Sequence, residues 1–202
     1  NLCGQDILYT GMTFGRGTLR PVDEFAVPAA VASVSGAAFA IRRSLWDRLG
    51  GFDPDFFMYY EETDLCWRAS LLGYSCRYVP NSVALHDAGL KPSPSAAYYA
   101  ARNRQIMLLK HWKWTTLLLV LPAWLLTELV ELAYLMRLGF EYAAGKMRAW
   151  TWLLGHPWQI LQARRGAQAG RVVKDVVLLR GCSDQLRPQV ILTGAIDGGL
   201  IR

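Results

Sequence analysis

The amino-acid sequence predicts an α/β domain followed by an all-helical region. In residues 1–90, short apolar segments typical of strands alternate with segments whose apolar residues recur at helical spacing. After the segment "KPSPS" at 91–95, nearly every segment up to about Arg180 has a helical pattern. We therefore expect an α/β domain at residues 1–90, a helical region at 91–180 and a tail at 181–202.

The first domain is expected to contain four short strands and two helices. A weak strand candidate comes first, and "VASVSGAAFAI" then reads as a buried strand with small residues at its centre. Two helices follow, each ended by glycine, and two more strands precede the linker. In chain order these elements are Ile7 to Thr10, 31–41, a helix within 42–52, Glu61 to Leu72, "YSCRYVP" and "SVALHD".

Composition and charge indicate a folded protein with two different halves. The chain is 52% hydrophobic and 19% charged, which excludes a disordered protein and favours membrane association. Residues 1–100 carry 8 Lys/Arg and 10 Asp/Glu, a net charge of −2, whereas residues 101–202 carry 14 and 6, a net charge of +8. This division predicts an acidic site in the first half and a basic surface in the second. The four cysteines have no metal-binding or disulfide spacing, so free thiols are expected.

The carboxylates of Glu61, Glu62 and Asp64 follow the apolar segment "FFMYY" directly and occupy the first turn of a predicted helix. The partial positive charge of a helix N-terminus stabilises anions, so these residues could simply be solvated charges at a helix end. A carboxylate kept ionised in this way also suits a general base that removes a proton from a hydroxyl. Asp64 and Arg68 are four residues apart and can form an ion pair along the helix.

His86 ends the predicted strand "SVALHD", 24 residues after Glu62. A single histidine is usually a packed or surface residue. If the strand returns beside the carboxylate helix, His86 is also a candidate metal ligand. The residue pattern alone leaves both interpretations open.

Residues 34–89 closely resemble the C-terminal half of the GT-A domain in glycosyltransferase family 2, and most of all its rhamnosyltransferase and galactofuranosyltransferase-like branch. The matching motifs are "SGA" followed by "RR", then "GGFD", "FFMYYEETDLCWR", a glycine one turn later, and "P…H", in that order over about 55 residues. The resemblance continues more loosely to about residue 113, through a tyrosine-rich helix with an Arg-Asn pair. It implies a partial, Rossmann-like GT-A domain containing the acceptor-side half.

The resemblance also implies roles for individual residues. The acidic pair of the family falls on Glu61 and Glu62, and its second member is the general base, so that role maps to Glu62. This sequence has Glu where the family usually has Asp, and its longer side chain requires a slight retreat of the backbone. Acceptor contacts are expected from Ser35, Gly36, Ala37 and Asp64, and His86 corresponds to a histidine that helps to hold the metal.

The donor half of such an enzyme is not recognisable in this sequence. The family binds a nucleotide-sugar through an N-terminal Rossmann-like half and an Asp-x-Asp motif that grips a divalent metal, Mg²⁺ or Mn²⁺. The "DPD" at 53–55 has the letters of that motif but belongs to the "GGFD" loop. We therefore expect the chain to be a fragment, inactive by itself, with most metal ligands upstream of Asn1.

The helical region is expected to lie on a membrane surface. Six of the eight tryptophans fall between residues 112 and 158, and Lys/Arg residues flank the apolar segments, as in interfacial helices. A spanning helix needs about 20 apolar residues, and here Pro122, Glu128 and Glu131 interrupt the apolar run at 115–138. A buried helix of a soluble assembly is the other alternative. Nucleic-acid binding is not expected, because the Leu-rich helices lack a basic polar face.

Two functional classes follow from the sequence. The first is a membrane-peripheral, inverting glycosyltransferase on the cytoplasmic face of the bacterial inner membrane, transferring sugar from a nucleotide-sugar donor to a glycan or lipid-linked acceptor. The second is a non-catalytic, membrane-associated adaptor, or degenerate paralogue, that keeps the fold. Intact "EETDL" and "GGFD" motifs favour the enzyme, and the Glu-for-Asp change favours the adaptor.

Overall fold

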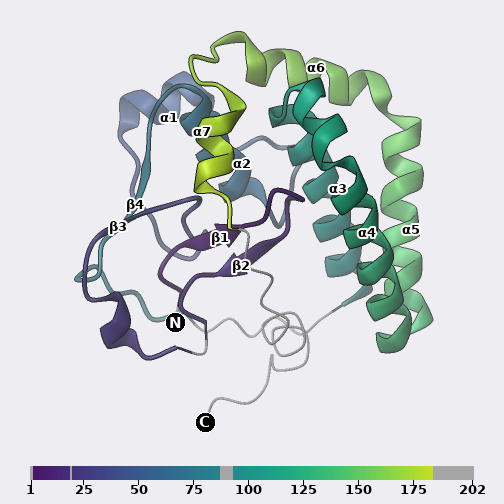
Figure 1. The fold of residues 1–202 in the computed structure, drawn as a ribbon, viewed down its shortest axis with the longest axis horizontal. Coiled ribbons are helices and arrows are strands. Elements are labelled where there is room, and N and C mark those ends of the chain that lie inside the picture. Colours follow the sequence, from purple (N-terminus) through teal and green to yellow (C-terminus); the bar gives the residue numbers. More distant parts are fainter. Residues whose placement is uncertain (1, 19, 87–92, 184–202) are drawn as a thin grey trace.

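A computed structural model describes residues 2–18, 20–86 and 93–183 (Figure 1). Two antiparallel strand pairs lie in the first part of the chain, β1 with β2 and β3 with β4. The strands are short: β1 is Gln5–Ile7, β2 is Thr13–Gly15, β3 is Ala29–Val31 and β4 is Cys76–Tyr78, with a 3₁₀ turn, η1, at Val22–Phe25. No parallel sheet forms among the described residues; a single parallel bridge joins Leu8 to Ser183.

Seven α-helices account for most of the described chain after Arg42. Their bounds are α1 Arg43–Leu49, α2 Glu61–Leu71, α3 Pro94–His111, α4 Trp114–Leu138, α5 Phe140–Gly155, α6 Pro157–Ala169 and α7 Asp175–Gly181. Gly50 ends α1 in the left-handed conformation, with φ of 75°. Ser93 begins α3, because its hydroxyl accepts a hydrogen bond from the Ala96 amide, and Pro94 follows at the first helical position.

The helix predictions are confirmed and two strand predictions are wrong. Of the predicted strand at 31–41, only Val31 is in a strand, because the small residues after Ser35 are mostly exposed and pack against little. Residues 82–86 of "SVALHD" are exposed and irregular, with no neighbouring strand. The first strand lies at Gln5–Ile7, slightly before its predicted position. Residues 184–202 of the predicted tail lie outside the described residues.

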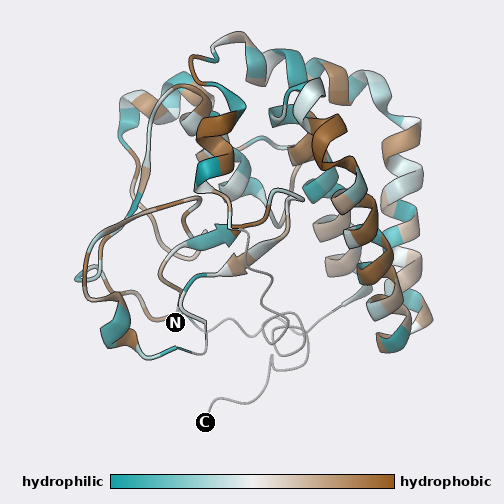
Figure 2. Ribbon diagram, in the orientation of Figure 1, coloured by the Kyte–Doolittle hydropathy of each residue, from teal (hydrophilic) through white to brown (hydrophobic). Residues whose placement is uncertain are grey.

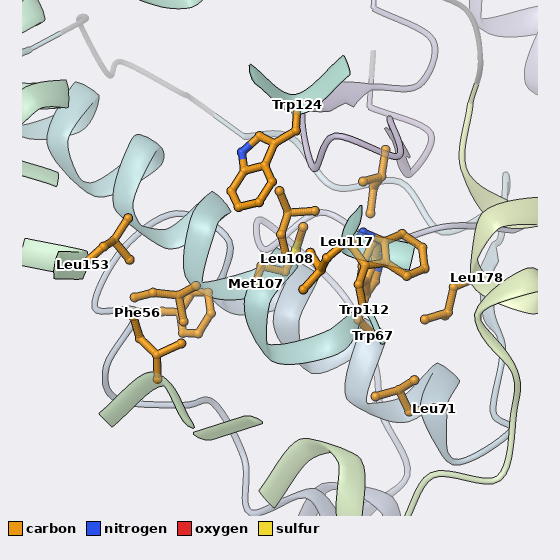
Figure 3. Packing of buried hydrophobic residues seen from close by; sticks show 13 residues of the cluster. Phe56, Trp67, Leu71, Met107, Leu108, Trp112, Leu117, Trp124, Leu153 and Leu178 are labelled. Carbon is orange, nitrogen blue, oxygen red and sulfur yellow. The ribbon is translucent and has the colours of Figure 1, made fainter. Parts of the chain in front are cut away.

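The hydrophobic core lies where α2, α3, α4 and α7 meet (Figure 3). Trp67 of α2 and Trp112 at the end of α3 pack edge to face, with ring centroids 4.9 Å apart. Leu117, Trp124, Leu153 and Leu178 extend the same cluster from the later helices. Helices of both predicted parts therefore share one core.

A buried charge cluster joins α3, α4 and α5. Arg104 of α3 pairs with both Glu128 and Glu131 of α4, and Lys146 of α5 pairs with the same two glutamates. Such groups are rarely buried without opposite partners, because desolvation of an unpaired charge is costly. The two acids expected to interrupt the apolar segment therefore point into the protein.

The opposite face of α4 is apolar and exposed (Figure 2). It presents Leu118, Leu119, Leu125, Leu126, Leu129, Val130 and Met136, each at least half exposed. By length and composition α4 is the one described helix that could cross a membrane; the mean hydropathy of its most apolar window is 1.8, and 28% of that window is buried. Pro122 does not interrupt α4, so the apolar segment at 115–138 lies within one continuous helix.

Candidate active site

The carboxylate helix begins from a strained loop. Phe57, Tyr59 and Tyr60 have φ angles of 58°, 63° and 69°, the left-handed region that residues other than glycine rarely adopt. Each such residue costs about 1–3 kcal/mol and persists only where its surroundings hold it. Tyr60 is the N-cap residue of α2, and no side chain caps that helix. The loop therefore determines where the first turn of α2 and its carboxylates point.

Arg102 and Asn103 of α3 hold this loop in place. The Asn103 amide nitrogen lies 2.7 Å from the carbonyl oxygen of Phe56 and 2.8 Å from those of Met58 and Tyr59. The Arg102 guanidinium donates to the carbonyls of Asp55 and Phe56. Asn103 is fully buried and Arg102 nearly so. The Arg-Asn pair was visible in the sequence, but its role depends on contacts more than forty residues apart.

Glu62 is half-buried and faces the predicted acceptor segment. Its Oε1 accepts a hydrogen bond from Gln5 Nε2 at 2.8 Å, and the same Gln5 amide accepts one from the Thr63 hydroxyl at 3.0 Å. A Cβ atom placed on Gly36 would lie 3.6 Å from the Glu62 carboxyl carbon. The structure therefore brings Glu62 and Gly36 together, with β1 orienting the carboxylate. No sequence signal singled out Gln5.

The rest of the predicted acceptor segment is at the surface next to Glu62. Gly36 and Ala37 are exposed and Ser35 is half-buried. The Ser35 hydroxyl accepts a hydrogen bond from the Ala37 amide at 3.3 Å, which bends the chain back on itself at Gly36. The absence of a side chain at Gly36 leaves the approach to the Glu62 carboxylate open.

Glu61 is chemically different from Glu62. Burial, and to a smaller extent the adjacent charge of Glu62, raises the pKa of Glu61 above its ordinary value. One of its carboxylate oxygens is buried without a hydrogen-bond partner among the described residues. Glu61 therefore holds a proton more readily than an ordinary glutamate.

Asp64 is a buried anchor of α2 rather than the acceptor contact expected from the sequence. Its side chain is fully buried and pairs with Arg68 Nε and Lys110 Nζ, each at 2.7 Å. Burial would raise the pKa of Asp64, but the charges of His111, Lys110 and Arg68 outweigh it and hold the pKa below its ordinary value. The predicted Asp64–Arg68 pair is confirmed, and the carboxylate has no exposed surface for an acceptor.

His86 lies on an exposed loop outside any helix or strand. Within residues 2–18, 20–86 and 93–183, no three His, Cys, Asp or Glu side chains converge as metal ligands. Asp53 of the "DPD" segment instead pairs with Lys110 at 2.6 Å. The family resemblance implies a divalent metal, but the donor set of the described residues does not fit one.

Comparison with known proteins finds a family profile and relatives that match parts of this chain. The profile of glycosyl transferase family group 2 matches residues 22–162. An N-acetylglucosaminyl-diphospho-decaprenol L-rhamnosyltransferase of Mycobacterium tuberculosis is 34% identical over 75 residues, 37% of this chain and 24% of the relative. Rhamnosyltransferase WbbL of Escherichia coli is 44% identical over 54 residues, 27% of this chain and 20% of the relative. No solved structure matches significantly.

The aligned regions cover about a quarter or less of those relatives' lengths. The mixed α/β arrangement of the described residues is consistent with a GT-A-like domain. Because the profile covers more than half of the chain and both relatives are rhamnosyltransferases, this chain belongs to glycosyl transferase family group 2 and is rhamnosyltransferase-like.

Proposed function

We propose that this chain carries the acceptor side of an inverting glycosyltransferase in which Glu62 is the general base. The observation that carries the proposal is the position of the Glu62 carboxylate: half-buried, oriented by Gln5, and next to the exposed bend at Gly36. A carboxylate held in a fixed orientation at an open surface can meet an incoming hydroxyl and accept its proton.

In this mechanism the acceptor sugar binds against Ser35, Gly36 and Ala37. Its hydroxyl attacks the anomeric carbon of the donor from the face opposite the diphosphate, while the carboxylate of Glu62 takes the hydroxyl proton. The diphosphate leaves with the electrons of the broken glycosidic bond, and the anomeric configuration is inverted. The donor is a nucleotide-activated hexose or deoxyhexose, and the acceptor a cell-envelope glycan or lipid-linked sugar.

Replacement of Glu62 tests this proposal in the full-length protein. Glu62→Gln keeps the size of the side chain but removes the base, so transfer should fall by at least about 100-fold with donor binding unchanged. Glu141→Gln is the matched control, because Glu141 is an exposed acid in the first turn of α5. Unchanged turnover in Glu62→Gln would remove this residue from the mechanism.

The role of Glu61 follows from the same assay. One carboxylate oxygen of Glu61 is buried, whereas Glu62 lies beside the exposed bend at Gly36, so we expect Glu61→Gln to retain more transfer than Glu62→Gln. Should the full-length wild-type protein bind membranes but transfer no sugar to any acceptor offered, the adaptor function would be favoured instead.

We also propose that residues 91–180 place the enzyme on the cytoplasmic face of the bacterial inner membrane. Support comes from the apolar face of α4, the net charge of the second half, and a relative named for a decaprenol-linked compound. The protein should float with anionic vesicles, less so at high salt, and Leu129→Glu should weaken flotation. Val177→Glu, on α7, is the control; a protein that stays in the soluble fraction would refute the membrane proposal.

A further inference from the structure

A cavity between α3 and α5 lies beside the strained loop. Its volume is about 540 Å³, and its walls are Ser95, Tyr98 and Tyr99 of α3 with Arg148, Thr151 and Trp152 of α5. The exposed ring of Phe57 lies against Tyr99, with centroids 5.2 Å apart. The cavity is thus joined to the loop that leads into Glu61 and Glu62. Tyr98 and Tyr99 belong to the tyrosine-rich helix of the family resemblance, but the proposed acceptor segment includes none of the cavity residues.

One guanidinium group, that of Arg148, lines this aromatic cavity, and a second, that of Arg102, lies against two of its rings. Arg102 is 7% exposed, and its guanidinium carbon lies 4.9 Å from the centroid of Trp152 and 5.1 Å from that of Tyr99. Arg148 is exposed and lies 5.6 Å from the ring centroid of Tyr98. Within the part of the chain that the structure describes, neither arginine pairs with a carboxylate. Two positive charges without anionic partners favour an anionic ligand, and guanidinium groups match phosphate geometry.

A second, apolar cavity continues from the first. It has a volume of about 450 Å³ between α4 and α5, and Arg148 and Thr151 line both cavities. Its other walls are Leu132 and Met136 of α4 with Phe140, Ala143, Ala144 and Met147 of α5. It opens beside the exposed apolar face of α4. Arg148 therefore stands where an aromatic, cationic cavity meets an apolar one.

We infer that these two cavities form one groove that binds a prenyl diphosphate, the carrier portion of a lipid-linked acceptor. The diphosphate lies against Arg148, the buried charge of Arg102 acts from behind the rings of Tyr99 and Trp152, and the prenyl chain lies along the apolar cavity between α4 and α5. The sugar on the diphosphate is then directed along Tyr99 and Phe57 toward the carboxylate helix. Aromatic rings bind the apolar faces of sugars as well as guanidinium groups. The inference rests on the proposed function and selects the lipid-linked acceptor class.

The inference is tested by measuring the equilibrium binding of farnesyl diphosphate to the full chain. Tryptophan fluorescence or calorimetry detects the binding. Inorganic diphosphate lacks the chain and farnesol lacks the charge, so each should bind at least about tenfold more weakly than farnesyl diphosphate. Arg148→Gln should weaken binding of farnesyl diphosphate about tenfold or more. Met136→Gln should weaken the binding of farnesyl diphosphate and leave the binding of inorganic diphosphate unchanged, because Met136 lines only the apolar cavity.

Arg165→Gln is the matched control. Arg165 is also exposed and stacked on an aromatic ring, Trp158, at 5.3 Å, but it lies on α6 and lines neither cavity. If Arg148→Gln and Arg165→Gln lost the same affinity for farnesyl diphosphate, the loss would be explained by net charge alone, and the inference would be overturned. Equal affinity for farnesyl and inorganic diphosphate would do the same, as would preferential, competitive binding of uridine diphosphate, which would make the groove a donor site.

This binding measurement is independent of sugar transfer. If Glu62→Gln abolishes transfer but farnesyl diphosphate does not bind, the assignment of the groove as a prenyl diphosphate site is wrong, and the proposed function stands. If farnesyl diphosphate binds as expected but Glu62→Gln keeps full turnover, the catalytic proposal is wrong and the groove stands. The unfolding midpoints of the exposed variants serve as the check on their folding.

Discussion

Replacing Asn103 by aspartate should destabilise the protein through a loop more than forty residues away. The substitution keeps the shape of the side chain and its Oδ1, which accepts from Arg102 Nε at 2.9 Å, but removes both N–H donors. Those donors serve the carbonyls of Phe56, Met58 and Tyr59. Asn103→Asp is therefore a test of the donors alone.

The size of the effect follows from the contacts. Two lost hydrogen bonds contribute about 1 kcal/mol each, and a carboxylate oxygen facing buried carbonyl oxygens costs about another 1 kcal/mol. Part of this loss of stability is offset when the left-handed residues relax, because each of them holds about 1–3 kcal/mol of strain. The free energy of unfolding should therefore fall by about 2–3 kcal/mol.

Urea unfolding followed by tryptophan fluorescence measures this change, since Trp67 and Trp112 lie in the core. Gln162→Glu is the control: it makes the same amide-to-acid change at an exposed position of α6 and should shift stability by less than about 0.5 kcal/mol. If Asn103→Asp matches that control, the amide does not hold the loop. In the full-length protein, the same variant should also lower transfer, because the loop positions Glu62.

Two further predictions come from buried titratable groups. Burial lowers the pKa of His111 to about 4; because unfolded histidine titrates near pH 6.5, stability should fall by about 3 kcal/mol from pH 7 to pH 4. His111→Gln should remove this part of the pH dependence, and an unchanged slope would show that His111 is not its source. Hydrogen bonding to the Cys76 thiol lowers the pKa of Cys66 to about 7, whereas burial raises that of Cys182 to about 12. The rate of Cys66 labelling by iodoacetamide should therefore level off above about pH 8, whereas that of Cys182 should still rise at about pH 9, as read by mass spectrometry; the same pH profile for both thiols would contradict the assignment.

Local sequence signals located the helices well because their causes are local. Gly50 and Ser93 end or begin helices through their own backbone or side-chain chemistry, and the first turn of α2 follows from the carboxylates at its start. The family was also recognisable from short motifs in a fixed order. The strand predictions were poorer because a strand needs a partner, and the small residues after Ser35 found none.

The role of each charged residue was decided by tertiary contacts. Asp64 and Glu62 are two residues apart in one helical turn, yet one is fully buried against Lys110 and the other lies beside Gly36. Periodicity places them on different faces of α2, but only packing against α3 makes one face interior. Glu128 likewise looked like an interruption of an apolar segment until Arg104 paired with it.

By itself, the sequence determined the helices, the acidic helix start and the family of this protein, because these depend on residues near one another in the chain. The tertiary structure alone decided which carboxylate is accessible, how Asn103 holds the strained loop, and that Arg102 and Arg148 both lie against the rings of one aromatic cavity. The physical reason is that burial and charge pairing arise between segments far apart in the sequence, and no local pattern encodes which segments meet.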